Sequence, residues 1–248
     1  MMNTAYRIGT AGWSLPKRHA AEFPMQGTHL GRYAQRFSAV EVNSSFYRPH
    51  KPETYARWAA SVPADFRFAV KVPREITHVR KLVATTAPLE RFLSEVRALE
   101  SALGPLLVQL PPSLRFDDRL VETFLGTLRD RYDDAIVCEP RHPTWFTSKA
   151  GALLTRFRIA CVAADPAVVP QAAEPGGWAG IAYRRLHGSP QTYYSSYSSE
   201  YLAAAARSIQ AGGAAAPEQW CIFDNTALGE ATANALELQR RLHLKPTT

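Results

Sequence analysis

Short β-rich runs alternate with helical or loop segments along this sequence, and that alternation limits the possible folds more than any other feature. Eight runs are expected to be strands: Arg7–Thr10, Ala39–Asn43, Arg67–Val72, Leu106–Gln109, Ala135–Glu139, Ile159–Asp165, Ile181–His187 and Trp220–Asn225. Strands that alternate with helices are typical of βαβ units, in which the strands are parallel. The pattern therefore predicts an α/β protein built on a parallel sheet.

Most of the segments between the expected strands have helical patterns. Leu89–Leu103 places its apolar residues at the three- and four-residue spacing of a helix, and Leu120, Phe124 and Leu128 repeat that spacing. Further helices are expected at Leu30–Phe37, Glu53–Ala60, Leu153–Phe157, Tyr201–Gln210 and Ala231–Leu242. The stretch Pro166–Gly177 is rich in Pro, Gly and Ala, and it is predicted to be a long loop where a sixth helix would stand.

The number of strands favours a closed barrel over an open sheet. A chain of 248 residues has the usual length of one α/β barrel. The main alternative is a doubly wound open sheet that binds a dinucleotide. Against it, the first strand and turn, Ile8–Trp13, lacks a full G-x-G-x-x-G, and Trp13 would crowd a pyrophosphate. We therefore expect residues 1–248 to form a single (β/α)8 TIM-type barrel domain.

Polar residues occur where most of the expected strands end, although buried parallel strands should be almost continuously apolar. Because side chains alternate between the two faces of a strand, Glu41 shares a face with Asn43, and Arg185 shares one with His187. The carboxyl ends of barrel strands converge on one mouth, where barrel enzymes carry their catalytic groups. Nine polar residues are predicted to meet there: Glu41, Asn43, Lys71, Gln109, Glu139, Asp165, Arg185, His187 and Asn225.

Composition narrows the choice of partner and compartment. Lys and Arg total 29 against 22 Asp and Glu, a net charge of +7 that favours anionic partners. The basic residues are spread along the chain without a block of like charge, so a dedicated nucleic-acid arm is not predicted. Three widely spaced cysteines lie in apolar runs, which indicates free thiols in a reducing compartment. With no apolar run of membrane-spanning length and no secretory pattern at the N-terminus, a cytoplasmic protein without membrane contact is expected.

The strand-end motifs resemble those of the YecE-like family, a group of bacterial and archaeal proteins of unassigned function. The resemblance extends over nearly the whole chain, through Ile8–Trp13, Val40–Tyr47, Phe68–Arg74, Val108–Pro112, Glu139–Pro143 with Trp145, Arg185–Gly188, Phe223–Thr226, Gly229, Ala231 and Asn234-Ala235. It implies a (β/α)8 barrel, which agrees with the prediction from the strand pattern. It implies no reaction and no cofactor.

An anion is the first candidate ligand for the predicted mouth. Lys71, Arg74, Arg141 and Arg185, together with His187, offer N–H donors suited to phosphate or carboxylate. Aromatic residues that are candidates for the walls of this pocket are Tyr47, Trp13, Trp145 and the run Tyr193–Tyr197. The partner expected from these residues is a small anion such as phosphate or a phosphorylated metabolite. For the charged residues, a buried ion-pair plug with a purely structural role is the alternative.

A divalent metal is the second candidate. Glu41, Glu139, Asp165 and His187 are plausible oxygen and nitrogen ligands. Lys71 and Arg185 at the same level would repel the ion and compete for the carboxylates, and no H-x-H or H-E-x-x-H spacing is present. No metal and no other cofactor is therefore predicted, while a metal-dependent hydrolase or isomerase stays open as an alternative.

Acid–base catalysis on a small anionic substrate is the function that these residues favour. Glu139 and His187 are the expected acid–base pair, with Glu41 as a second candidate base. Lys71 could form a Schiff base, but a salt-bridged Lys71 is favoured over it. The alternative without catalysis is a nucleic-acid or small-ligand binding module, in which bases would stack on the tyrosines of Tyr193–Tyr197. The sequence leaves the reaction, the substrate and the oligomeric state open.

Overall fold

The computed structural model describes residues 4–243, whose strands form two sheets with mainly parallel pairing. The order is β1-β10-β9-β7 in one sheet and β2-β3-β4-β5-β6-β8 in the other, and only the β6–β8 pair is antiparallel. The strands are β1 Ala5–Thr10, β2 Ala39–Val42, β3 Arg67–Lys71, β4 Leu103–Gln109, β5 Ile136–Glu139, β6 Ile159–Cys161, β7 Ala163–Asp165, β8 Gly176–Gly177, β9 Ala182–Leu186 and β10 Glu218–Phe223. The predicted α/β fold with parallel strands is confirmed.

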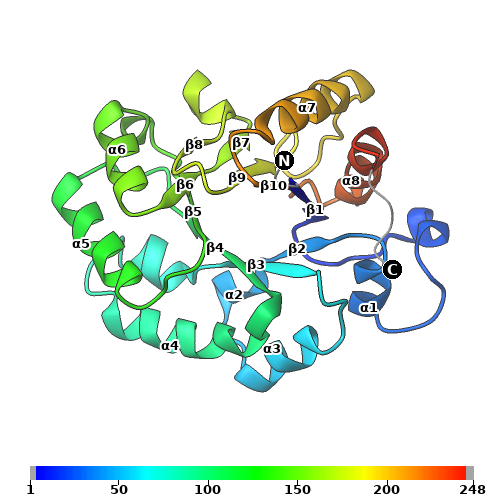
Figure 1. The fold of residues 1–248 in the computed structure, drawn as a ribbon, viewed down its shortest axis with the longest axis horizontal. Coiled ribbons are helices and arrows are strands. Elements are labelled where there is room, and N and C mark those ends of the chain that lie inside the picture. Colours follow the sequence, from blue (N-terminus) through cyan, green and yellow to red (C-terminus); the bar gives the residue numbers. More distant parts are fainter. Residues whose placement is uncertain (1–3, 244–248) are drawn as a thin grey trace.

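Helices surround the strands on the outside of the molecule, as Figure 1 shows. They are α1 His29–Ala34, α2 Ser44–Tyr47, α3 Pro52–Ala59, α4 Thr86–Val96, α5 Asp118–Arg129, α6 Ser148–Arg156, α7 Ser199–Gly212 and α8 Glu230–Arg241. Shorter turns are 3₁₀ helices at Lys17–Glu22, Arg97–Ala102, Pro143–Trp145 and Pro170–Ala173, and a π-helical turn at Glu75–Val79. In residues 4–243, no helix is long and apolar enough to cross a bilayer.

The edges of the two sheets lie next to each other at two places. Only Val162 separates β6 from β7, and its backbone N–H donates to the carbonyl of Cys138 on β5 at 2.8 Å. At the other edge, the backbone N–H of Gly12, just after β1, donates to the carbonyl of Glu41 on β2 at 2.9 Å. Gly9 allows this approach, because a Cβ there would lie 2.0 Å from the carbonyl oxygen of Ala39.

Two apolar cores occupy the two faces of the strands. The larger one packs the helices against the sheets and includes residues such as Ile8, Val40 and Val70. The smaller one consists of residues that alternate with these along the strands and therefore lie on the other face. Its buried members are Ala39, Ala69, Leu107, Val137, Ala160, Val162, Ile181, Tyr183, Trp220 and Ile222. Beyond the smaller core, at the carboxyl ends of the strands, the next residues on the same face continue this alternation.

Three elements differ from their predicted form. The expected strand Ile159–Asp165 is divided into β6 and β7, which belong to different sheets. The expected loop Pro166–Gly177 contains the 3₁₀ helix Pro170–Ala173 and ends in β8. The helix expected over Leu89–Leu103 ends at Val96, because a 3₁₀ helix follows in which Glu100 adopts a left-handed φ of 50°. Its apolar spacing still holds, since Leu99 is fully buried.

Candidate functional site

Alternation along the strands brings charged side chains together beyond the smaller core. On β2, Ala39 of that core is followed two residues later by Glu41, and on β9 Tyr183 is followed by Arg185. The same step leads to Lys71 on β3 and Glu139 on β5. We use the name strand-end cluster for seven residues in mutual contact or close electrostatic range: Glu41, Lys71, Glu139, Arg141, Arg185, His187 and Asp224.

Arg185 is the centre of the cluster and is completely buried. Its Nε and NH2 donate to the two carboxylate oxygens of Glu41 at 2.9 and 2.6 Å. Its NH1 donates to Glu139 Oε2 at 2.6 Å, and its NH2 also reaches Asp224 Oδ2 at 3.0 Å. Burial alone would lower the pKa of Arg185, but Glu139, Glu41 and Asp224 outweigh it and hold this pKa well above its usual value.

The pKa values of two carboxylates in the cluster, Glu139 and Asp224, shift downward. Burial would raise the pKa of Glu139, yet Arg185, His187 and Arg141 together hold it well below its usual value. The pKa of Asp224 is also lowered, since Arg185 and His187 outweigh the effect of burial. Both groups are therefore carboxylates at neutral pH, and they act as acceptors for the donors around them.

His187 lies between two of these carboxylates and is also completely buried. Its Nδ1 is 3.0 Å from Asp224 Oδ2, and its Nε2 is 3.0 Å from Glu139 Oε1. The NH2 of Arg141 lies 2.5 Å from the same Nε2. A neutral ring that donates from Nδ1 to Asp224 accepts at Nε2 from Arg141, whereas a ring protonated at both nitrogens donates from Nε2 to Glu139. The contacts of Nε2 thus suit both protonation states.

Lys71 differs from the other cations of the cluster. It is 7% exposed, and its Nζ lies 4.3 Å from the centre of the Phe46 ring. Among residues 4–243, no carboxylate lies within the 4.0 Å of an ion pair, which corrects the expectation of a salt-bridged Lys71. The physical reason is that the buried Arg185 already forms ion pairs with both Glu41 and Glu139. Burial and the charge of Arg185 lower the pKa of Lys71 to about 8, against the opposing pull of the carboxylates.

Three neutral side chains donate to the carboxylates of the cluster. Gln109 Nε2 donates to Glu139 Oε2 at 3.2 Å, and Asn43 Nδ2 donates to Asp224 at 3.4 Å. The hydroxyl of Tyr183 donates to Glu41 Oε2 at 3.0 Å. The sequence placed Gln109 and Asn43 here but missed Tyr183. Its position two residues before Arg185 was the available signal, because alternation puts the two on one face.

Asp165 and Asn225 do not belong to the cluster, contrary to the expectation. Asp165 accepts a hydrogen bond from the Tyr197 hydroxyl at 2.8 Å, and Asn225 donates to Asn234 Oδ1 at 2.8 Å. The register on β10 explains the error for Asn225. Trp220 and Ile222 belong to the smaller core, so Asp224 continues their face and Asn225 points the other way.

Within residues 4–243, no hydrogen bond or ion pair joins the cluster to four other expected site residues: Trp13, Tyr47, Arg74 and Trp145. Trp145 is buried in the larger core and donates from Nε1 to the Leu114 carbonyl at 2.9 Å. Trp13 packs edge-on against Trp58, and Tyr47 is 78% exposed. Arg74 is exposed, and neither a hydrogen bond nor an ion pair joins it to the cluster within residues 4–243. Tyr193 of the predicted tract packs edge-on against His187, with ring centres 6.1 Å apart.

The acidic side chains of the cluster are already committed to cations. Among residues 4–243, no three His, Cys, Asp or Glu side chains are arranged to hold a metal ion. Arg185 lies between Glu41, Glu139 and Asp224 and forms an ion pair with each of them. Three carboxylates of the cluster thus face three cationic side chains, namely Arg185, Arg141 and Lys71.

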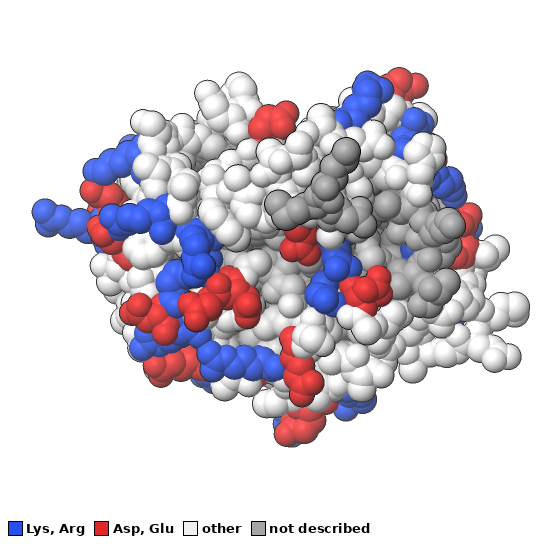
Figure 2. Space-filling view, viewed as in Figure 1, with Lys and Arg blue, Asp and Glu red and all other residues white. Residues whose placement is uncertain are grey.

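Charges on the surface are mixed in sign. Figure 2 shows basic and acidic residues side by side over the part of this face where Figure 1 places α4 and α5. Ion pairs join neighbouring elements there, including Arg91–Glu75, Arg131–Glu90 and Arg156–Glu122. This part of the surface therefore does not form the continuous basic stripe that tracks a nucleic-acid backbone.

The sequence of this chain matches a protein-family model and two curated proteins. The family model described as "Protein of unknown function DUF72" matches residues 7–248. The curated UPF0759 protein YecE from two Escherichia coli strains is 32% identical over 142 residues, which are 56% of this chain and 49% of the relative. The match thus spans about half the length of these curated relatives.

Solved structures of similar fold cover nearly the whole chain. A DUF72 family protein from Enterococcus faecalis is 22% identical, covers 99% of this chain and 100% of its own, and has a TM-score of 0.81. A DUF72 family protein from Thermotoga maritima is 24% identical, with 96% and 99% covered and a TM-score of 0.78. At these identities the likeness concerns the fold.

Proposed function

Because the chain belongs to the DUF72 family of proteins of unknown function, we propose a function from its own residues: an enzyme that acts on a small anionic substrate at the strand-end cluster by acid–base chemistry. The observation that carries this proposal is His187, held at 3.0 Å between Asp224 and Glu139. A buried imidazole with a carboxylate at each nitrogen is oriented for proton transfer.

Binding of the substrate is assigned to the outer cations of the cluster. Arg185 is fully buried and saturated by carboxylates, whereas the side chain of Arg141 is 18% exposed and Lys71 is 7% exposed. A phosphate or carboxylate group can therefore approach Arg141 and Lys71 from solvent. Arg141 supplies planar N–H donors, and Lys71 supplies a charge without an ion-pair partner of its own among residues 4–243.

Proton transfer is assigned to His187, with Glu139 as its partner. In the free protein the NH2 of Arg141 contacts both Nε2 of His187 and Oε1 of Glu139. An anion that draws Arg141 toward solvent would free Nε2 to take a proton from the substrate. Glu139, a carboxylate because of its lowered pKa, would then accept the new N–H and stabilise the imidazolium. Asp224 keeps the ring in place through Nδ1 during this exchange.

Lys71 supports a second, covalent version of the same site. A pKa of about 8 leaves roughly one amine in ten unprotonated at pH 7, far more than for an ordinary lysine. The amine nitrogen would bond to the carbonyl carbon of a substrate, and the carbonyl oxygen would leave as water to give an imine. Borohydride reduction would fix the adduct, and mass spectrometry of peptides containing Lys71 would detect it. If no aldehyde or ketone leaves an adduct, the noncovalent version stands alone.

Binding and turnover can be tested on the same protein. Calorimetric titration with phosphorylated sugars, nucleotides and small carboxylates should give heat for at least one class. Lys71→Met and Arg141→Gln should abolish it, while Arg91→Gln on the exposed surface of α4 should leave it unchanged. His187→Asn should retain binding and lose turnover of that ligand. Absence of heat across the panel, or equal binding by the Lys71 and Arg141 variants, would remove the proposal.

We also propose that residues 1–248 form one closed (β/α)8 barrel. Support comes from the β1–β10 pairing, from the backbone bridge between Ala11 and Glu41, and from β6 and β7 acting as one interrupted strand. The antiparallel β8 would then be an addition outside the eight strands. A cytoplasmic location is proposed as well, because Cys138, Cys161 and Cys221 are buried free thiols.

A further inference from the structure

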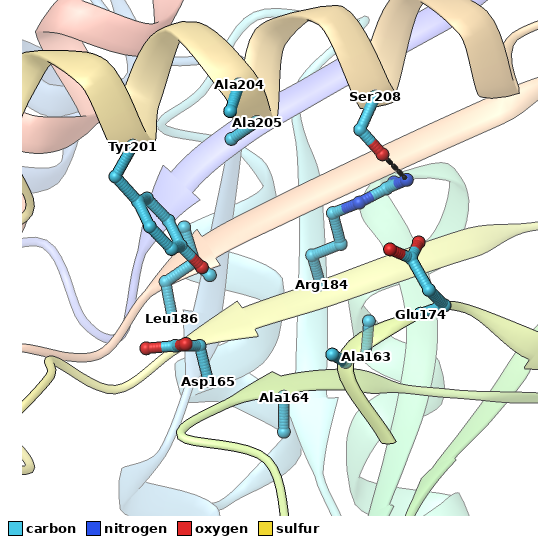
Figure 3. Close-up of a pocket in the computed structure, with 11 residues that line it drawn as sticks. Ala163, Ala164, Asp165, Glu174, Arg184, Leu186, Tyr201, Ala204, Ala205 and Ser208 are labelled. Carbon is cyan, nitrogen blue, oxygen red and sulfur yellow. Dashed lines mark hydrogen bonds between the residues drawn. The ribbon is translucent and has the colours of Figure 1, made fainter. Parts of the chain in front are cut away.

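A cavity of about 280 Å³ lies on the opposite face of β9 from the strand-end cluster, between β7, β9 and α7. Figure 3 shows Arg184 crossing it from β9 toward Ser208 on α7, with Asp165 at the other end. Arg184 precedes Arg185 directly, so alternation sends the two side chains to opposite faces of the strand. We call this cavity the α7 pocket.

Arg184 is a buried cation whose partners are neutral. It is 9% exposed, and its NH1 donates to Gln219 Oε1 at 2.9 Å while its NH2 donates to Ser208 Oγ at 3.3 Å. Within residues 4–243, no carboxylate oxygen lies within 4.0 Å of it. A guanidinium has five N–H donors, so several remain for a ligand. Burial lowers the pKa of Arg184 although the charge of Glu174 opposes this, and an anion bound beside the guanidinium would reduce the cost of burying it.

The remaining charges of the α7 pocket are negative. Asp165 pairs with Leu186 along the strands, whereas Arg184 pairs with Ala163 two residues earlier. The two positions are therefore offset by about 7 Å at the usual rise per residue. Glu174, an exposed residue, holds its carboxylate on the Arg184 side of the pocket in Figure 3, away from Asp165. One guanidinium with two carboxylates disfavours a dianion such as a phosphate ester, because the pocket already carries excess negative charge.

The wall between the charged ends is apolar and narrow. Ala204 and Ala205 on α7 and Leu186 on β9 line it, and the ring of Tyr201 reaches across from α7 toward Asp165. Methylene groups of a ligand would fit along this wall without leaving a polar atom unpaired. The pocket thus has Arg184 with Glu174 beside it at one end, a short apolar middle, and Asp165 at the other end.

We propose that the α7 pocket binds an ω-amino acid, with its carboxylate on Arg184 and Ser208 and its ammonium group facing Asp165. The offset between Arg184 and Asp165 selects a zwitterion whose charges are separated by several bonds. This site is independent of the strand-end cluster, because the two lie on opposite faces of β9. A ligand of the pocket therefore reports on Arg184 and not on the acid–base chemistry proposed above.

The experiment is calorimetric titration of the intact chain with three matched probes: 5-aminopentanoate, pentanoate and pentylamine. The zwitterion should bind at least tenfold more tightly than either probe that lacks one charge. Equal binding of pentanoate would overturn the proposal, because it would show that Asp165 does not contribute to binding. Equal binding of glycine would overturn the proposed charge separation, and no heat from any probe would overturn the site as a whole.

Variants locate the binding in the α7 pocket. Arg184→Gln and Asp165→Asn should each weaken 5-aminopentanoate at least tenfold, whereas Arg207→Gln, an exposed neighbour on α7, should not change it. Ala204→Leu places a larger side chain in the cavity and should block binding even if Arg184→Gln does not fold. Unchanged affinity in Ala204→Leu and Asp165→Asn would place the ligand elsewhere and overturn the proposal.

Discussion

Arg184 and Arg185 are neighbours on one strand, yet their surroundings are opposite. Arg185 is bound by three carboxylates in the strand-end cluster, while Arg184 has two neutral partners in the α7 pocket. Both are almost completely buried, so burial does not distinguish them. The difference teaches that the charge opposite a buried cation decides its role. A compensated guanidinium organises the protein around it, and an uncompensated one is available to a ligand.

Among the substitutions that test this comparison, the largest loss of stability is expected at Arg185. Arg185→Gln leaves Glu41, Glu139 and Asp224 buried without their common partner, and it should lower the free energy of unfolding by about 3–5 kcal/mol. Denaturant unfolding at neutral pH measures this loss. A loss below 1 kcal/mol would show that the three carboxylates do not depend on Arg185.

The next effect is expected at Lys71 and has the opposite sign. Its folded pKa of about 8 lies below the usual 10.5, so between these values the unfolded chain binds the proton and the folded chain does not. Stability should therefore rise with pH through this window. Lys71→Met should remove the rise and increase the free energy of unfolding at pH 7 by roughly 1–3 kcal/mol.

Unfolding of the wild type and of Lys71→Met between pH 7 and 10.5 tests this expectation. The two curves should approach each other as the pH increases, because the wild-type amine is then neutral. A parallel pair of curves would mean that the Lys71 charge is compensated in the folded protein, which would place it with Arg185 in the comparison.

A smaller effect is expected from Asp224, which contacts both Arg185 and His187. Its folded pKa is lowered, so its contribution is present above the unfolded value of about 4 and is lost as the pH falls through the folded pKa. Asp224→Asn should cost about 2 kcal/mol at pH 7. Acid titration of stability checks this, because the difference between wild type and variant should shrink below about pH 4.

The sequence predicted the members of the cluster correctly where the alternation of side chains left no doubt about which residues face inward. Arg185 and His187 share a face, and two polar residues at that spacing identified it correctly. At the end of β10, Asp224 and Asn225 are adjacent polar residues, so either could have pointed inward. The choice depends on Trp220 and Ile222 filling the smaller core, which only the packed structure reveals.

The sequence could not predict which cation forms an ion pair with which carboxylate. The sequence predicted a salt-bridged Lys71, whereas in the structure Glu41 and Glu139 both pair with Arg185. The length and direction of the side chains across the strands decide this, and strand spacing alone does not contain that information. The α7 pocket was missed for a related reason. Asp165 and Arg184 both line the α7 pocket, whereas Asp165 was predicted to lie at the mouth with the other strand-end residues.

The smallest effect is expected from Arg184, and it sharpens the comparison most. Arg184→Gln removes a buried charge that has no carboxylate oxygen within 4.0 Å among residues 4–243, and the amide can still contact Gln219. Loss of two hydrogen bonds and relief of an uncompensated charge act in opposite directions, so the free energy of unfolding should change by less than about 1 kcal/mol. The measurement is denaturant unfolding beside Arg185→Gln under the same conditions. If both variants lose several kcal/mol, Glu174 or Asp165 compensates Arg184 in solution, and the contrast between the two arginines fails. If only Arg185→Gln loses several kcal/mol, the contrast holds. Arg185, which is paired with carboxylates, then stabilises the fold, and Arg184, which is not, is free to bind a ligand.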